Sequence, residues 1–399
     1  MRNGQCNMSN SQRMKSRRIS YRKFNSIVFL FPFVLVSIIG FSNMLIDPYG
    51  IWNLLNFSFN TQKVEKYNHQ RLFKAEDIIH LKPKVVLLGS SRTFFGLNPD
   101  YYEEITGQKA YNAGFSAANT EEELAYLRHA LVNQPGIQQV IIGLDFYSFN
   151  EHNSGRQDFL LDRLEKSHIN WNDFTSTLFS QDAVKASLNT MKFNVNNKFT
   201  EPLIFPNGLI SASGIKQFHL LGANGQEAFA RELEVYINNY QFYYNYKYSA
   251  QRLQDVRTMV ELCKERNIDV KVFISPSHAT QWEAIQTSGL WLQFEQWKRD
   301  IAAITSVWDF SGYNSITTEP ISDNMKYYWD NSHYKERTGE LVFDRLMNYQ
   351  SGSVPQDFGR LLTPSTVNQV IDEINVEREK WAKDNKKTTD FVKGLKQNR

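Results

Sequence analysis

Two kinds of apolar stretch alternate along most of the chain. Short runs such as Val85 to Leu88 are apolar at every position, as strands buried on both faces are. Between them, apolar residues recur every three or four positions, as on one face of a helix. The predicted strands are 85–88, 109–112, 138–145, 270–275 and 306–310; helices are predicted before Pro83 and near 98–107, 120–134, 253–263, 290–304 and 338–347. This alternation predicts an α/β fold with a mostly parallel sheet and helices on both of its faces.

Polar residues mark where two of these helices begin. Asn98 followed by Pro99 is typical of a helix start, and Gly107 is typical of the end of that helix. Thr120 and Glu123 have the spacing of a capping box, which predicts that Thr120 caps the next helix.

The first 46 residues have a different pattern. Residues 24–46 carry no charge and are long enough to cross a bilayer as a helix. The segment before them contains several basic residues and no acidic one: Arg2, Arg13, Lys15, Arg17, Arg18, Arg22 and Lys23. Because basic flanks stay in the cytoplasm, we expect a single-pass anchor with residues 1–23 inside and the main domain periplasmic or extracellular.

Two other interpretations of the apolar segment were weighed. A cleaved signal peptide would have a shorter apolar region followed by a small-residue cleavage site, and the sequence after residue 39 offers no good one. A buried helix of a soluble protein would not require the uninterrupted basic flank.

Composition excludes several classes of function. The chain of 399 residues is 41% hydrophobic and 14% aromatic, so a sizeable core is available. A net charge of +3 gives no support for a nucleic-acid-binding surface. The two cysteines, Cys6 and Cys263, would lie on opposite sides of the membrane and could not pair. Neither they nor the scattered histidines have the spacing of metal ligands, so no metal or cofactor is expected.

The remaining chain is divided by composition. Residues 47–65 are expected to be a linker, 66–350 the main domain and 351–399 a polar C-terminal helix and tail. Within the main domain, 146–248 is an insert that is too long for a structureless loop. It should overhang the active edge of the sheet because it follows the third strand. Its aromatic rings could stack on sugars or form the core of a lid: Tyr236, Tyr240, Phe242, Tyr243, Tyr244, Tyr246 and Tyr248.

Candidate chemistry lies at the carboxyl ends of the strands, where sheets of this kind bind ligands. Ser90 and Ser91 follow the first strand, although two serines there could also simply cap a helix. A serine needs a base to become nucleophilic. Asp330 and His333, three residues apart before the last core helix, can place a carboxylate against one imidazole nitrogen. We therefore predict Ser91 as nucleophile, His333 as base and Asp330 as the group that orients it.

These motifs resemble the SGNH (GDSL-type) hydrolases and acyltransferases. The resembling residues are Gly89-Ser90-Ser91-Arg92, the segment YNAGFS at 111–116 and the Asp330-x-x-His333 pair. The resemblance is greatest to the membrane-anchored bacterial branch, which includes alginate O-acetylation proteins and the D-alanine transfer protein of teichoic acids. It covers about 66–350 without the insert, and implies a flavodoxin-like three-layer sandwich that needs no cofactor.

The resemblance also implies roles for further residues. The main-chain N–H groups of Ser91 and Gly114 would hold the oxyanion. Arg92, Asn112, Asp145 and His278 are weaker candidates for substrate binding; Arg92 could instead form a structural salt bridge, and a structural role is favoured for His278. Two positions depart from the family pattern: Ser90 replaces an acidic residue, and Asp145 replaces an asparagine that donates to the oxyanion. Asp145 could instead orient Arg92, and Asn119 or Asn150 could supply the missing donor.

Together these observations predict an esterase or O-acyltransferase of the bacterial cell envelope. It would act on an envelope or exported polysaccharide through an acyl-Ser91 intermediate, with acetyl as the expected acyl group. A transferase would need a partner membrane protein that delivers the acyl donor. The alternative is a non-catalytic protein of the same fold that binds glycan or assembles a polysaccharide-modification complex.

Overall fold

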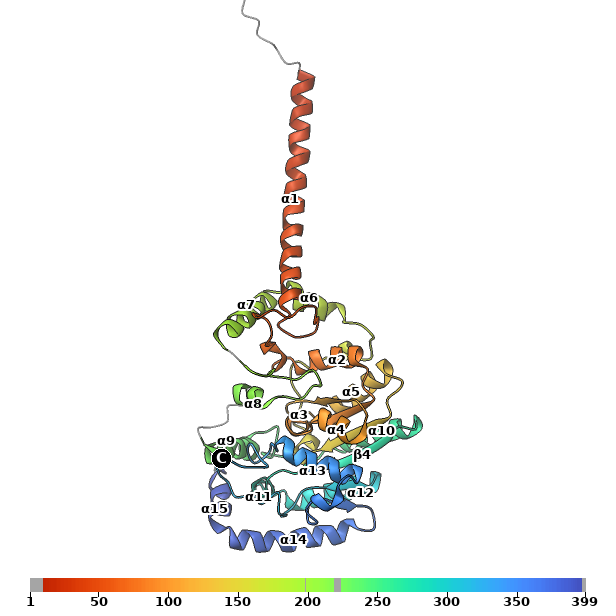
Figure 1. Cartoon of the computed structure of the whole chain (residues 1–399), viewed down its shortest axis with the longest axis vertical. Coiled ribbons are helices and arrows are strands. Elements are labelled where there is room, and N and C mark those ends of the chain that lie inside the picture. The colour runs from red at the N-terminus through yellow and green to blue at the C-terminus, as the bar shows by residue number, and fades with distance from the viewer. Residues whose placement is uncertain (1–9, 198, 219–223, 397–399) are drawn as a thin grey trace, which may run out of the picture. The chain divides into compact units, whose positions relative to one another are not determined.

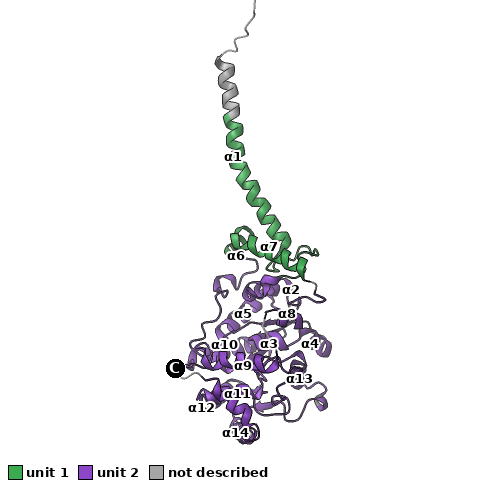
Figure 2. Cartoon of the chain, turned by 90° about the vertical axis from the view of Figure 1, so that its left-hand side faces the viewer, with its two compact units in different colours: residues 1–63, 171–197 green, residues 64–170, 198–399 purple. Residues whose placement is uncertain are grey.

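The computed structural model describes residues 10–197, 199–218 and 224–396, and the chain divides into two compact units (Figure 2). Unit 1 consists of residues 1–63 and 171–197. Unit 2 consists of residues 64–170 and 198–399 and holds the sheet.

A six-stranded sheet forms the centre of unit 2. Its strands are β1 (Val85–Gly89), β2 (Ala110–Gly114), β3 (Gln139–Leu144), β4 (Asp269–Ile274), β5 (Val307–Asp309) and β6 (Arg360–Leu362). They lie in the order β2-β1-β3-β4-β5-β6, parallel except for β6, which runs antiparallel to β5. The prediction of a mostly parallel sheet is confirmed. The order of the first five strands is the flavodoxin-like one, with the switch point between β1 and β3.

The helices of unit 2 pack in two groups beside this sheet. They are α2 (Gln70–Leu81), α3 (Ser91–Gly96), α4 (Pro99–Thr106), α5 (Thr120–Asn133), α8 (Ala212–Phe218), α9 (Gly225–Asn238), α10 (Ala250–Glu265), α11 (Ala279–Thr287), α12 (Trp291–Ile304), α13 (Glu336–Met347), α14 (Val367–Asp384) and α15 (Lys386–Gly394), with 3-10 turns at Val64–Lys66, Phe146–Phe149, Leu161–Arg163 and Ser351–Ser353. Helix α5 contacts α2 and α10, and α10 contacts α12. Helix α13 contacts α3 and α4, so the short helix after β1 belongs to the other group.

Local sequence signals explain most helix ends, with one correction. Asn98 caps α4 by accepting from the N–H of Asp100, and Gly107 ends it in the left-handed conformation, as predicted. The predicted capping box at Thr120 is wrong. Asn119 caps α5 instead, accepting from the N–H of Glu122 at 3.0 Å. Thr120 already lies inside the helix, where its hydroxyl donates to Asp255 on α10 at 2.9 Å.

The C-terminal segment is part of the packed unit rather than a free tail. Strand β6 extends the sheet, and α14 and α15 pack against α12 and α11 (Figure 1). Apolar residues three and four apart on α14, including Val367, Ile371 and Ile374, are buried, as is Val392 on α15. Although the C-terminal segment is polar in composition, each helix has a narrow apolar stripe, which is enough for it to pack on the rest of unit 2.

Unit 1 contains α1 (Asn10–Ile46), α6 (Trp171–Phe179) and α7 (Gln181–Asn196). Residues Tyr21–Ile46 form a helix apolar enough and long enough to cross a membrane, a property shared by signal sequences and some core helices. Helices α6 and α7 come from the middle of the 146–248 insert, yet they pack on α1 (Figure 2). The insert is thus divided between the two units.

Candidate active site

Ser91, His333 and Asp330 form a continuous chain of hydrogen bonds in unit 2. The Ser91 Oγ lies 2.9 Å from His333 Nε2. The other ring nitrogen, Nδ1, lies 3.0 and 2.9 Å from the two carboxylate oxygens of Asp330. All three side chains are buried, and Ser91 retains 8% exposure. This is the arrangement in which a histidine can take a proton from a serine while a carboxylate fixes its orientation.

The turn after β1 positions the serine. Gly89 has a φ of +148°, and a Cβ there would meet the Thr93 hydroxyl at 2.3 Å, so a side chain cannot be accommodated. Ser90 caps α3, its hydroxyl accepting from the N–H of Arg92 at 3.2 Å. Ser91 is therefore the first residue of α3, where the main-chain N–H has no acceptor within the helix. The cap role considered for the serine pair belongs to Ser90 alone.

The Asp330-x-x-His333 turn is held from within. The Asp330 carboxylate accepts from the main-chain N–H groups of Ser332 and His333, each at 2.8 Å. The ring of Phe95, from the end of α3, stacks on the imidazole with centroids 4.5 Å apart. Carboxylate and phenyl ring thus restrict the imidazole from two sides, which fixes the face that His333 presents to the serine.

Arg92 is a buried cation in a salt bridge, the alternative considered to its role in substrate binding. It is 2% exposed and pairs with Asp145 at 2.6 Å, while its Nε donates to the Ser332 hydroxyl at 3.1 Å. The Asp145 carboxylate also accepts from Ser90. Although burial disfavours the charge, the Asp145 carboxylate and nearby tyrosines raise the pKa of Arg92 well above its usual value. Asp145 therefore orients Arg92, one of the two roles considered for it, and is too buried to meet substrate.

Asn112 and Gly114 serve the packing of β2 against α3. The amide of buried Asn112 donates to the carbonyls of Thr93 and Leu97 at 2.7 and 2.9 Å. Its oxygen accepts from the N–H of Gly114 at 3.0 Å, so this N–H is not available to an oxyanion. A Cβ on Gly114 would lie 2.6 Å from the Phe94 nitrogen, which explains the glycine. The oxyanion role of Gly114 and the substrate role of Asn112 are contradicted by these contacts.

His278 has a structural role, which was one of the two roles considered for it. It caps α11, with Nδ1 accepting from the N–H of Thr280 at 3.2 Å and Nε2 donating to the Glu319 carbonyl at 2.7 Å. Burial lowers its pKa to about 4, so it is neutral near pH 7. The two asparagines considered as oxyanion donors are also engaged: Asn119 donates to Asn153, and Asn150 to Tyr240 and Phe242.

A pocket of about 390 Å³ is lined in part by Ser91 and His333. None of Arg92, Asn112, Asp145 and His278 lines it. Its lining combines aromatic rings with polar side chains: Tyr67, Ser91, Phe95, Ser116, Ala117, Tyr147, Arg156, Phe218, Arg231, Glu232, Val235, Tyr236, Asn239, Gln241, Phe242 and His333. Of the six tyrosines predicted to contact sugar or form a lid, Tyr236, Tyr243 and Tyr246 are buried, and Tyr236 also lines the pocket.

Ala117 is a site residue that the sequence analysis missed. It lines the pocket with Ser91 and His333, and its φ of +54° is left-handed, a conformation in which glycine is usual. The loop after β2 thus places its left-handed residue three positions beyond Gly114. The unusual backbone, rather than the presence of a glycine, marks the functional turn.

Replacing Ala117 with glycine is expected to stabilise the protein by about 0.5–1 kcal/mol, because relief of left-handed strain exceeds the added entropy of the unfolded chain. Urea unfolding measures this change. Ala130→Gly, inside helix α5, is the matched control and should destabilise by about 1 kcal/mol or more. A loss of stability in Ala117→Gly as large as in the control would show that residue 117 is not strained.

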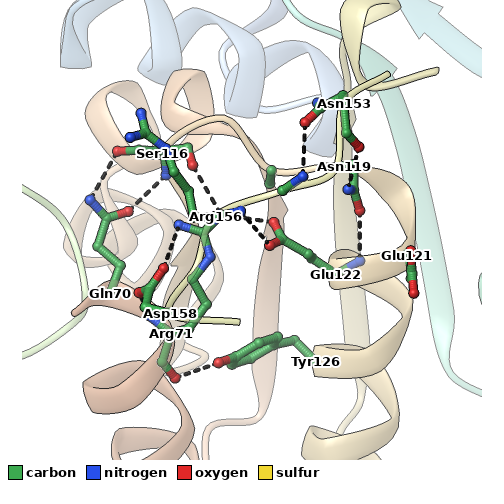
Figure 3. Close-up of polar contacts among 12 residues, drawn as sticks. Gln70, Arg71, Ser116, Asn119, Glu121, Glu122, Tyr126, Asn153, Arg156 and Asp158 are labelled. Atoms are coloured by element: carbon green, nitrogen blue, oxygen red, sulfur yellow. Dashed lines mark hydrogen bonds and ion pairs between the residues drawn. The ribbon is translucent and has the colours of Figure 1, made fainter. Parts of the chain in front are cut away.

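A polar network holds the loop that carries Ala117 (Figure 3). The Gln70 side chain accepts from the N–H of Ser116 at 2.7 Å and donates to its hydroxyl at 2.9 Å. Arg71 donates to the Ser116 carbonyl at 3.0 Å and to the buried Glu122 carboxylate at 2.7 Å. Helix α2 therefore fixes three polar groups of the residue immediately before Ala117, which makes Gln70 a positioning residue for the pocket.

Gln70→Ala is expected to lower kcat for ester hydrolysis about tenfold with little change in KM, because misplaced groups weaken transition-state binding most. Steady-state kinetics with p-nitrophenyl acetate measures both constants. Gln254→Ala, at an exposed position of α10, is the matched control. A rise in KM with kcat unchanged would contradict the positioning role.

No group of histidine, cysteine, aspartate or glutamate that could hold a metal ion occurs among residues 10–197, 199–218 and 224–396. Cys263 is a free thiol in α10, and burial raises its pKa to about 12. Cys6 lies outside the described residues.

Comparison with known proteins adds two distant structures. No family model and no curated protein matches the chain. A structure from Bacteroides fragilis described as an acylhydrolase is 13% identical, with a TM-score of 0.31. The match covers 72% of this chain and 87% of the Bacteroides chain. A structure from Streptococcus pneumonia described as a platelet activating factor is 11% identical, with a TM-score of 0.32, and covers 71% and 94%. Similarity this low carries no argument about the chain.

Proposed function

We propose that the chain is a serine-dependent ester hydrolase or O-acyltransferase of the SGNH type, anchored to a membrane by α1 with unit 2 outside the cytoplasm. The observation that carries the proposal is the hydrogen-bonded series Asp330–His333–Ser91, of which Ser91 and His333 line a pocket. The flavodoxin-like strand order supports it, because β1 then delivers the serine to the edge where such sheets bind ligands.

The reaction proposed proceeds in two acyl transfers. Ser91 Oγ attacks the ester carbonyl while His333 Nε2 takes the serine proton, and Asp330 stabilises the imidazolium through Nδ1–H. Collapse of the tetrahedral intermediate breaks the ester bond, and His333 returns the proton to the departing alcohol. Water or a sugar hydroxyl then gives its proton to His333 and attacks the acyl-Ser91 ester; as the bond to Ser91 breaks, His333 returns that proton to Ser91 Oγ, which restores the free serine.

Two main-chain N–H groups are proposed to hold the negative oxygen of the intermediate. They are those of Ser91, at the first position of α3, and Ala117, in the left-handed turn beside it. Donors of this kind typically contribute about 3–4 kcal/mol each to the transition state. Asp145 cannot act as a third donor because its carboxylate only accepts hydrogen bonds.

The proposed substrate is an acetylated polysaccharide of the cell envelope or one that is exported. Tyr67 and Phe218 in the pocket lining stack with centroids 4.5 Å apart, and rings of this kind offer apolar surface to sugars. Arg156, Asn239 and Gln241 in the same lining can bond to hydroxyl groups. An acyltransferase would in addition need a membrane protein partner that supplies the acyl donor.

A fluorophosphonate probe tests the proposal on the purified full chain. We expect covalent labelling at Ser91, located by mass spectrometry, and release of p-nitrophenol from p-nitrophenyl acetate. Acetate release from acetylated polysaccharide would identify a hydrolase, and acetyl transfer to the unmodified polysaccharide a transferase. Absence of labelling in a folded protein would overturn the enzyme proposal and favour a glycan-binding or assembly protein of the same fold.

A further inference from the structure

We propose that α6, α7 and the loop 47–63 form a membrane-contacting surface that lies in the headgroup region of the bilayer. This surface, called here the interfacial platform, is a second membrane contact of the chain beside the α1 span. The inference rests on the proposed anchoring by α1 and is independent of the chemistry at Ser91.

The first observation is direct packing of α6 and α7 on the apolar helix. A Cβ on Gly40 would lie 2.2 Å from the ring of Phe179, so the end of α6 touches the α1 backbone. Asn43 donates to the Leu178 carbonyl at 2.8 Å and accepts from Ser187 on α7 at 2.7 Å. All of these contacts fall inside the apolar segment Tyr21–Ile46.

The position of the contacts along α1 sets their depth. Gly40 and Asn43 precede Ile46 by six and three residues, which correspond to about 9 and 4.5 Å along a helix axis. If α1 crosses the bilayer, its last two turns lie at the boundary between acyl chains and headgroups. Helices α6 and α7 contact these turns and must therefore lie at the same boundary.

The second observation is the apolar character of what these elements expose. Seven large apolar side chains are at least 40% exposed: Leu54 52%, Leu55 53%, Phe57 40%, Trp171 74%, Phe179 42%, Leu188 61% and Val195 72%. Single exposed apolar residues are ordinary on soluble proteins, but a concentration beside an apolar helix is not. Tryptophan is also the side chain most typical of the membrane–water interface.

The charges on α7 favour lipid over a protein partner. Lys185, Leu188, Lys192 and Val195 follow one another at three- and four-residue intervals and are all exposed, so they share one helix face. A helix face that alternates lysines with apolar residues can bind at a bilayer surface. The apolar side chains enter the acyl-chain layer, and the lysine side chains extend toward the phosphate headgroups. Asp182, 3.3 Å from Lys185, is the one exposed acid of α7, and Asp173 on α6 is buried.

Nitroxide labels on the full chain test the proposal. In a Cys6→Ser/Cys263→Ser background, single cysteines replace Trp171, Leu188 or Val195, and the protein is reconstituted into vesicles of phosphatidylethanolamine and phosphatidylglycerol. Relaxation by oxygen and by a water-soluble nickel chelate then reports depth. We expect the oxygen-to-nickel accessibility ratio at these sites to exceed severalfold that at Gln254→Cys, an exposed control in unit 2.

Three outcomes would contradict the proposal and are distinguishable. Ratios like that of Gln254→Cys at all three sites, with Leu35→Cys in α1 shielded from nickel, would remove the platform and leave the anchor intact. Nickel access at Leu35→Cys would remove the anchor and the platform together. Shielding of the three sites from both reagents would indicate a protein partner instead of lipid. Fluorophosphonate labelling of the same variants reports separately on Ser91, so failure of the proposed chemistry would not be confused with any of these results.

Discussion

Replacing Ser91 with alanine is expected to lower kcat for ester hydrolysis by about 10⁶-fold, the loss typical of a triad nucleophile. The free energy of unfolding should change by less than about 1 kcal/mol, since the substitution removes one hydroxyl that bonds only to His333 among the contacts described for it. Kinetics with p-nitrophenyl acetate and urea unfolding of the same variant measure the two effects separately.

The three residues should behave as one unit. His333→Ala and the double variant with Ser91→Ala should each lose about as much activity as Ser91→Ala alone, because a serine without its base is no better than none. Asp330→Asn should cost about 10⁴-fold, since an amide favours the wrong tautomer of His333. Its remaining oxygen can still accept from the main chain, so the turn at 330–333 is kept.

Ser365→Ala, at an exposed position in the segment before α14, is the control for the loss of a serine and should retain full activity. Ester hydrolysis by Ser91→Ala within tenfold of the parent would rule out the proposed acyl-Ser91 route. Additive losses in the Ser91→Ala/His333→Ala variant would show that the two side chains act separately.

Arg92→Met is expected to lower the free energy of unfolding by about 3–5 kcal/mol, the cost of leaving one partner of a buried ion pair alone. The residue that loses its ion-pair partner is Asp145, which is 2% exposed and lies 2.6 Å from the guanidinium. The same substitution removes the Arg92 donor from the Ser332 hydroxyl and leaves its contact with Tyr236 at 2.8 Å; because Ser332 precedes His333, activity should fall as well. Urea unfolding followed by tryptophan fluorescence measures the stability change.

A double variant separates the loss of the pair from the loss of packing. Arg92→Met/Asp145→Leu should recover much of the stability, because exchanging a whole buried pair for apolar groups is often close to neutral. Arg337→Met removes the exposed pair with Glu340 and should cost less than about 1 kcal/mol. Equal costs for Arg92→Met and Arg337→Met would show that burial of the Arg92 pair has no special consequence.

The sequence predicts the parallel strands because each contains a short apolar run between helical segments, although β2, β4 and β5 also contain polar residues. All five observed parallel strands overlap the predicted ones. Strand β6 was missed, since three residues that pair antiparallel at the sheet edge carry no period of their own. The short α3 was missed because six residues are too few to establish a helical period in the sequence.

The candidate site was predictable where the signal is local. Asp330 and His333 are three residues apart, and their turn needs only its own main chain. The approach of His333 to Ser91, 242 residues away, depends on the tertiary fold, and was expected from the need of a serine for a base and from the resemblance rather than from any local pattern. The oxyanion role was predicted for Gly114, whereas the left-handed residue in the pocket lining is Ala117. Glycine is favoured both where packing is tight, as at Gly114, and where the backbone is left-handed. Sequence alone does not tell which of these requirements a glycine meets.

The division of the insert between the units has a consequence for how unit 2 could be released from α1 by proteolysis. The chain passes between the units three times, after residues 63, 170 and 197. A protease that cut only near residue 63 would leave unit 2 covalently joined to α6 and α7, which remain packed on α1. Release of unit 2 therefore requires cuts at all three crossings, or a cut near residue 63 followed by dissociation of α6 and α7 from α1. A protein tethered by one linker has no such protection.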